Sequence, residues 1–205
     1  KAPLVESRFE NSIYIVRIYQ FDKTIESVWK KEIETILATC SQQTTLCAGI
    51  VLDLRNNPGG YVDGAKIIVS EFLSDGSIFT ITTSDGVVSN YEVVPGGKLA
   101  SPKLVILVND GTVSAAEIVA GSLQFRKRAT LVGGKTFGKG VIQETFDLSN
   151  GSGLHITTAK WTLPDGTWIH EKGIHPDVEI QDNPNTPVDE QLQKAISILN
   201  SSTNR

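Results

Sequence analysis

A serine that precedes a predicted helix is the first residue of this chain whose surroundings suit chemistry. Ser114 follows the apolar run 104–108 and a turn that contains Gly111, and a segment of small and apolar residues begins at Ala115. The N-terminus of a helix has free N–H groups and partial positive charge, and both stabilise a developing oxyanion. Ser114 is therefore a candidate nucleophile, with helix capping as the alternative role for a serine in this position.

A nucleophilic serine needs a base, and both histidine and lysine are available. The three histidines, His155, His170 and His175, come late in the chain, and a Ser-His-Asp triad with distant members stays open. Lys139 lies between two glycines, after an aromatic residue and before an apolar strand. A lysine accepts a proton only in its neutral form, which burial favours. Lys139 is therefore a candidate base, and a surface lysine in a tight turn is the alternative.

A glycine-rich turn at residues 56–60 follows another buried apolar segment. Ligand-facing loops of α/β sheets commonly follow strands in this way. The adjacent residues Gly59 and Gly60 allow backbone N–H groups to come close to a ligand. The turn is thus suited to an oxyanion hole, although an ordinary Pro-Gly-Gly turn has the same sequence.

These three candidates lie in segments whose residues form a more specific pattern together than alone. They read Asp-Leu-Arg-Asn-Asn-Pro-Gly-Gly at 53–60, Asn-Asp-Gly-Thr-Val-Ser-Ala-Ala-Glu-Ile-Val-Ala-Gly at 109–121 and Thr-Phe-Gly-Lys-Gly-Val-Ile-Gln at 136–143. In order and spacing they resemble the carboxyl-terminal processing proteases, also called tail-specific proteases. The resemblance covers residues 4–199, with further similar segments at 151–161, 163–166, 173–178 and 189–195.

The resemblance implies a role for each candidate. Ser114 is the expected nucleophile, Lys139 the general base, and Gln143 the side chain that holds the lysine amine in place. The N–H groups of Ala115 and Gly60 are the expected oxyanion hole, with Gly59 as the near alternative to Gly60. Two positions depart from the family, which often has serine where this chain has Thr112 and Ala116; Ser122, further along the helix, is expected to be a packing residue.

The elements that must position these residues alternate between short apolar runs and segments of helical period, which predicts an α/β fold. The resemblance refines this to a crotonase/ClpP-like mixed αββ core with additional β-strands and a C-terminal helix. The chain is expected to contain strands at 13–19, 49–54, 104–108, 129–133, 141–147 and 153–161, a hairpin at 77–94 turning at Asp85-Gly86, and helices at 25–36, 63–73, 114–125 and 187–199. Thr186 is the expected cap of the last helix, with Pro187 in its first position.

Composition sets the broad limits. The chain has 205 residues, 40% of them hydrophobic and 20% charged, with a net charge of −4, which argues against disorder and against a nucleic-acid partner. No apolar run approaches the roughly 20 residues of a membrane span, so membrane association is expected only through segments outside this sequence. There is no methionine, which indicates a fragment or a processed product.

The expected domain organisation follows from the resemblance. Residues 1–205 are predicted to be a single protease core domain, in which residues 1–12 are a lead-in after a missing PDZ domain and residues 200–205 are a flexible tail. That upstream PDZ domain is the expected partner within the full-length chain, and a protein or peptide tail is the expected substrate. Neither a cofactor nor a metal is expected.

The predicted function is a serine endopeptidase with a Ser-Lys dyad, which cleaves near unstructured C-terminal tails through an acyl-enzyme in an extracytoplasmic compartment such as the periplasm, cell envelope or lumen. Two alternatives share the fold: a non-proteolytic ligand- or peptide-binding relative, and a crotonase-type acyl-CoA enzyme that would need neither Ser114 nor Lys139. Cys40 and Cys47 flank a polar loop, and a disulfide in an oxidising compartment or two free thiols both stay open.

Overall fold

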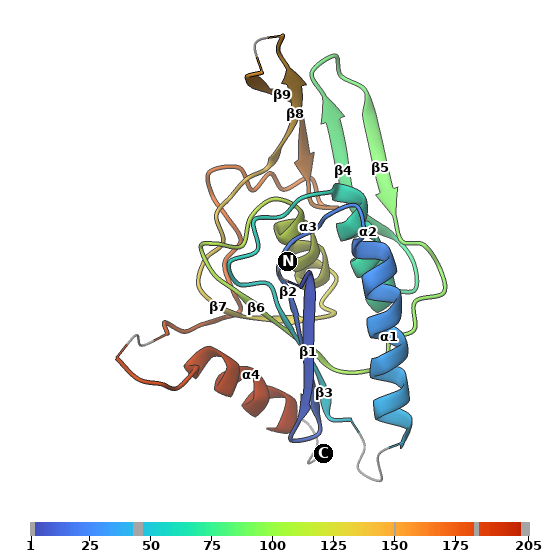
Figure 1. Cartoon of the computed structure of the whole chain (residues 1–205), viewed down its shortest axis with the longest axis vertical. Coiled ribbons are helices and arrows are strands. Elements are labelled where there is room, and N and C mark those ends of the chain that lie inside the picture. Colours follow the sequence, from blue (N-terminus) through green and yellow to red (C-terminus); the bar gives the residue numbers. More distant parts are fainter. Residues whose placement is uncertain (1–2, 43–46, 150, 183–184, 202–205) are drawn as a thin grey trace.

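A six-stranded sheet forms the centre of the molecule (Figure 1). The computed structural model describes residues 3–42, 47–149, 151–182 and 185–201. The sheet has the order β1-β2-β3-β6-β7-β10, and all neighbours are parallel except β1 and β2. Its strands are β1 (Val5–Glu10), β2 (Ile13–Ile18), β3 (Gly49–Asp53), β6 (Leu104–Val108), β7 (Thr130–Gly133) and β10 (Val178–Glu179).

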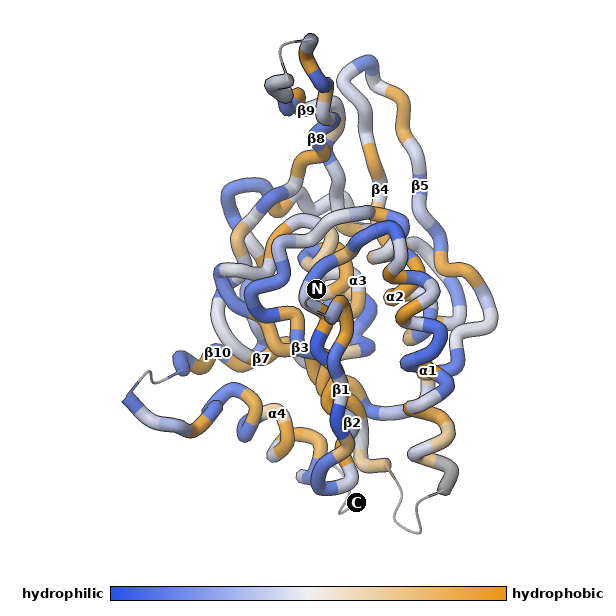
Figure 2. The backbone as a smooth tube through the Cα atoms, viewed as in Figure 1, coloured by the Kyte–Doolittle hydropathy of each residue, from blue (hydrophilic) through white to orange (hydrophobic). Residues whose placement is uncertain are grey.

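Helices cover both faces of this sheet. The helices α1 (Ile25–Gln42), α2 (Val62–Phe72) and α3 (Ala115–Phe125) share one apolar core with alternate strand residues such as Ile50 and Leu52. The helix α4 (Glu190–Ser201) lies on the other side, where Val51 packs with Ala195 (Figure 1). The central strands β3 and β6 are buried along their whole length and are apolar except for Asp53 at the end of β3 (Figure 2), as expected for parallel strands that are covered on both faces.

A second, antiparallel sheet of four strands has the order β5-β4-β9-β8. It consists of β4 (Ser77–Thr83), β5 (Val88–Glu92), β8 (Val141–Asp147) and β9 (Gly153–Thr162). The hairpins β4–β5 and β8–β9 extend beyond the body of the molecule on the side where α2 and α3 lie (Figure 1). Strand β8 is an edge strand that begins directly after the glycine-flanked lysine.

The predicted α/β class is confirmed, and every predicted strand and helix is present. The helix predicted at 25–36 extends to Gln42, and residues 5–10 of the predicted lead-in form β1, which pairs with β2 in the central sheet. The predicted cap of the last helix is wrong. The helix begins at Glu190, and Asp189 caps it by accepting a hydrogen bond from the Leu192 N–H at 2.8 Å, whereas the Thr186 hydroxyl donates to the Glu190 carboxylate. The predicted flexible tail is also too long, because α4 includes residues 200 and 201; residues 202–205 lie outside the described part.

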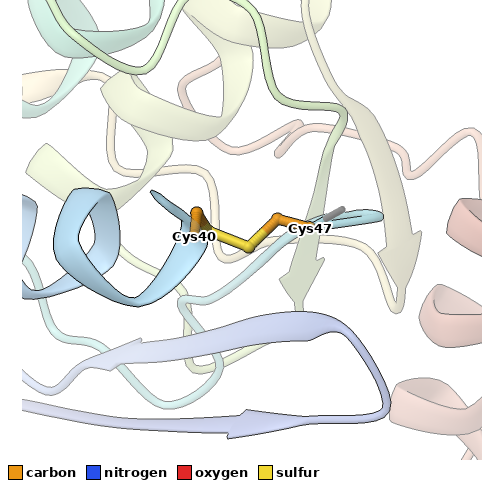
Figure 3. The surroundings of a disulfide bond; sticks show 2 residues. All are labelled: Cys40 and Cys47. Carbon is orange, nitrogen blue, oxygen red and sulfur yellow. A yellow bond between two sulfur atoms is a disulfide. The ribbon is translucent and has the colours of Figure 1, made fainter. Parts of the chain in front are cut away.

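Cys40 and Cys47 form a disulfide between the end of α1 and the start of β3 (Figure 3). Their Cα atoms are 5.4 Å apart, within the usual range for a disulfide. The structure thus selects the bridge over two free thiols, and no free cysteine remains in the chain. Residues 43–46 of the enclosed loop lie outside the described part.

Membrane-spanning helices and metal-binding clusters are both absent from the part of the chain that the structure describes. Within the described residues, every helix lacks the length or the apolar character needed to cross a bilayer. Across the same residues, no group of three or more His, Cys, Asp or Glu side chains is arranged to hold a metal ion.

Candidate active site

One cavity of about 460 Å³ brings most of the predicted site residues together. Ser114, Lys139, Gln143 and Gly60 all line it, although they come from three separate segments of the chain. Ala115 follows Ser114 as the buried first residue of α3. Apolar side chains complete the wall, namely those of Pro58, Val62, Val141 and Ile142, and His155 lines the cavity as well.

Ser114 occupies a strained turn between β6 and α3. Its φ angle of 57° is unusual for a residue other than glycine, and such backbone conformations cost about 1–3 kcal/mol. A sharp strand-to-helix turn of this kind presents a nucleophile's hydroxyl away from the backbone. Ala115 follows in the first helical position, where an N–H has no acceptor within the helix. The turn therefore combines an accessible hydroxyl with a free donor beside it.

Glu117 joins the serine turn to the lysine segment. Its side chain is fully buried. One carboxylate oxygen accepts the N–H groups of Ser114 at 2.9 Å and Lys139 at 2.8 Å. The other oxygen accepts the Gly138 N–H at 2.7 Å and the Thr136 hydroxyl at 2.6 Å. Four donors on one buried carboxylate fix the serine turn and the lysine segment to a common point.

Glu117 was not among the predicted site residues. Its position indicates a role at the start of the helix, because a glutamate three residues after a helix-capping serine has the spacing of a capping box. What the spacing could not show is that the same carboxylate also binds the backbone of Lys139, which lies 22 positions further along the chain.

The glycines on either side of Lys139 allow its segment to lie against the turn at 168–173. A Cβ atom on Gly138 would come within 2.7 Å of the Gly173 nitrogen, and one on Gly140 within 2.9 Å of the His170 nitrogen. Two indole N–H groups also hold this segment: Trp161 donates to the Lys139 carbonyl at 3.0 Å, and Trp168 donates to the Gly140 carbonyl at 2.8 Å. The lysine backbone is therefore held from both sides.

Gln143 lies on β8 and lines the cavity together with Lys139, Val141 and Ile142. The strict alternation expected for this strand is not observed, because three consecutive residues line the same cavity. Gln143 is exposed, and its amide nitrogen is 3.5 Å from the Thr157 hydroxyl on β9. A β-bulge between Ile142 and Gln143 shifts the pairing with β9 at this point.

The glycine turn distinguishes between its two candidate donors. The Gly59 N–H donates to the Asn57 side-chain oxygen at 2.9 Å, so it is already occupied. Asn57 is fully buried and is itself held by a 2.7 Å hydrogen bond to the Ile18 carbonyl. Gly60 has a φ angle of 134° and lies so close to Phe21 that a Cβ atom would overlap the Phe21 carbonyl. Gly60 is therefore the donor that this turn leaves available.

Arg55 attaches the same turn to α4. Its guanidinium donates two hydrogen bonds to each of Asp53 and Asp189, the shortest at 2.8 Å, and one to Gln191 at 3.0 Å. Burial by itself lowers the pKa of Arg55, but the two carboxylates outweigh it and raise that pKa above its usual value. For Asp189, burial acts in the opposite direction and raises the pKa. Hydrogen bonds from Arg55 and from the Leu192 N–H outweigh burial, so that the pKa of Asp189 is lowered overall.

The remaining predictions concern packing and the histidines. Ser122 is a packing residue as predicted: it is buried, and its hydroxyl donates to the Ile78 carbonyl at 2.8 Å. The buried Thr112 hydroxyl donates to the Leu54 carbonyl at 2.9 Å and so joins the ends of two strands. Of the histidines, His155 lines the cavity, with its Nδ1 atom 3.0 Å from the Thr145 hydroxyl.

A serine on a strained turn, a lysine and backbone donors around one cavity give the molecule the layout of a serine hydrolase. The chain belongs to peptidase family S41, whose family model matches residues 12–180. A carboxyl-terminal-processing protease from Synechocystis is 39% identical over 97% of this chain and 46% of its own length. The carboxy-terminal processing protease CtpA of Bacillus subtilis is 35% identical over 84% of this chain and 36% of its own length.

Solved structures agree with this membership. The photosystem II D1 C-terminal processing protease has a TM-score of 0.77 and 29% identity, and the match covers 95% of this chain and 52% of that one. The tricorn protease shares the fold at a TM-score of 0.63 and 19% identity. The chain thus spans between a quarter and a half of the length of the curated relatives it matches.

Proposed function

We propose that this chain is the catalytic core of a serine endopeptidase that uses a Ser114–Lys139 dyad. The observation that carries the proposal is the cavity that Ser114, Lys139, Gln143 and Gly60 line together. Membership in a peptidase family supports it independently. The same cavity would have no need of Ser114 or Lys139 in a crotonase-type acyl-CoA enzyme or in a non-catalytic binding relative.

In the proposed mechanism the Ser114 hydroxyl attacks the peptide carbonyl while the neutral Lys139 amine accepts its proton. The N–H groups of Gly60 and Ala115 stabilise the resulting oxyanion, and loss of one such donor typically lowers the rate by about 10²–10³-fold. The carbon–nitrogen bond then breaks, and Lys139 passes the proton to the leaving amine. Water, activated by the same lysine, hydrolyses the acyl-enzyme. The Gln143 side chain, which β8 carries, orients the Lys139 amine.

The proposed substrates are the unstructured C-terminal tails of proteins or peptides. The names of the relatives, which describe carboxyl-terminal processing, support this class of substrate. We also propose that an upstream PDZ domain presents the tail in the full-length protein, by adding it as a strand to a sheet edge. An extracytoplasmic location is supported by the Cys40–Cys47 disulfide, because such bonds persist in oxidising compartments.

The test is cleavage of a fluorogenic peptide by three variants. Ser114→Ala and Lys139→Ala should each lower kcat by about 10⁴-fold or more, because loss of one member of a catalytic unit disables the others as well. Lys135→Ala is the matched control: this lysine is exposed, comes four residues before Lys139 and lies outside the cavity. A serine-directed reagent should label the parent chain but not Ser114→Ala. Full activity of Lys139→Ala would instead favour a histidine base such as His155.

A further inference from the structure

A second cavity, of about 340 Å³, lies next to the segment that carries Lys139. Its lining is mostly apolar and includes Val141, Ala159 and the ring of Trp168. Trp168 is 40% exposed although the other two tryptophans are buried, with exposed fractions of 0% and 1%. An exposed indole beside an apolar hollow is typical of a binding site for an apolar group.

The charged side chain at this cavity is cationic. Lys160 lines it together with the His170 ring, and none of the described lining residues is acidic. The Lys160 ammonium lies over the Trp168 ring, 5.7 Å from its centre, and the rings of Trp168 and His170 are 5.1 Å apart. The His170 Nδ1 atom is buried and has no hydrogen-bond partner among the described residues. An anion would complement both groups.

Hydroxyl-bearing residues also line the cavity, including Thr83 and Ser84 at the end of β4, and Thr157 and Thr158 on β9. The Thr83 hydroxyl already donates to Asp85 and the Thr157 hydroxyl accepts from Gln143. The hydroxyls of Ser84 and Thr158 can donate and accept, so they suit the alternating N–H and C=O groups of a peptide backbone. The volume accommodates one large apolar side chain together with its terminal carboxylate.

We propose that this second cavity binds the apolar C-terminal residue of a polypeptide, with the side chain on Trp168 and the carboxylate at Lys160 and His170. The choice of a polypeptide end over a free organic acid rests on the proposed function; the apolar anion itself is inferred from the lining alone. Val141 lines both this cavity and the catalytic one, and Trp168 bonds to the Gly140 carbonyl. The ligand would therefore contact the same strand that positions Lys139.

Binding is measured on the Ser114→Ala chain, so that no cleavage occurs and the result does not depend on catalysis. The probe is the peptide acetyl-Ser-Ala-Ala-Leu with a free carboxylate, and the amidated peptide is its neutral counterpart. Trp168 fluorescence should change and saturate with the acid. The amide should bind about two- to five-fold more weakly, which is the range of one partly exposed ion pair.

Variants locate the interaction. Lys160→Gln should reduce affinity for the acid to that for the amide and leave the amide unaffected. Lys172→Gln is the matched control, because this exposed lysine belongs to the adjacent turn but does not line the cavity. Equal binding of acid and amide would overturn the proposal, as would an acid preference that survives in Lys160→Gln. Binding of hexanoate as tight as that of the peptide would also overturn it, in favour of a free acid.

Discussion

Glu117 is the residue whose substitution best tests how the catalytic segments are held together. In Glu117→Gln the side chain keeps its size, but an NH₂ group replaces an oxygen that accepts two hydrogen bonds. Because bonds to a charged group contribute about 1.5–3 kcal/mol, we expect a loss of at least 2 kcal/mol in the free energy of unfolding. We also expect a larger fall in kcat than rise in KM, because the proposed dyad would be displaced while the apolar wall of the cavity would stay in place.

The measurements for Glu117→Gln are urea unfolding and peptide cleavage. Glu92→Gln is the control, since it makes the same chemical change at an exposed position on β5. A variant that unfolds at the same urea concentration as the parent chain, with unchanged kcat, would show that the four hydrogen bonds to Glu117 do not position the dyad.

Gly138 allows a separate test of close packing at the lysine. Gly138→Ala adds a methyl group at a φ angle of 91°, within 2.7 Å of the Gly173 nitrogen. Gly86→Ala is a well-matched control, because Gly86 has a φ angle of 89° but open space around its Cα atom. Both substitutions carry a backbone cost of about 1–3 kcal/mol. Only Gly138→Ala should also lower kcat, because the lysine segment must move away from the turn.

At the scale of elements, the structure shows where local sequence is sufficient and where it is not. The strand 104–108 was predicted with its observed ends, because a continuous apolar run bounded by polar residues is unambiguous. The start of α4 was not, because Asp189 is held by Arg55 from 134 positions away. The choice of Gly60 over Gly59 likewise depends on the Asn57 side chain, whose orientation no local pattern reveals.

Asp189 combines a helix cap with an ion pair, and two substitutions separate them. Asp189→Asn keeps a good capping side chain and removes the charge, whereas Asp189→Ala removes both. Because the Asp189 side chain is 36% exposed, solvent screens the pair, and we expect Asp189→Asn to lose about 1 kcal/mol at pH 7. Asp189→Ala should lose about a further 1 kcal/mol, the usual value of an N-cap.

The pH dependence has a definite sign. The pKa of Asp189 is lower in the folded chain than its usual value of about 4, so its contribution to stability is present above that pH and is lost as the pH falls through the folded pKa. The Tm of the parent chain should therefore fall more steeply from pH 5 to pH 2 than the Tm of Asp189→Asn. Parallel Tm curves for the two would contradict this ion pair.

In the molecule as a whole, the central sheet places the disulfide at one end of its strands and the proposed active site at the other. Gly60 and Ser114 follow the carboxyl ends of β3 and β6, whereas Cys47 precedes the amino end of β3. The disulfide is thus at the opposite end of the sheet from the cavity that Gly60 and Ser114 line. Each end can in principle be altered while the other keeps its geometry.

This separation predicts that removing the disulfide lowers stability but not catalysis. Cross-linking a loop this short restricts the unfolded chain and contributes about 2–3 kcal/mol. The double variant Cys40→Ser/Cys47→Ser should therefore unfold at a lower urea concentration, and treatment with a reductant should shift the parent chain by the same amount. Below the Tm, kcat should stay within about twofold, because the cysteines lie at the other end of the sheet from the cavity. A loss of kcat at unchanged stability would instead mean that the two ends of the sheet are coupled.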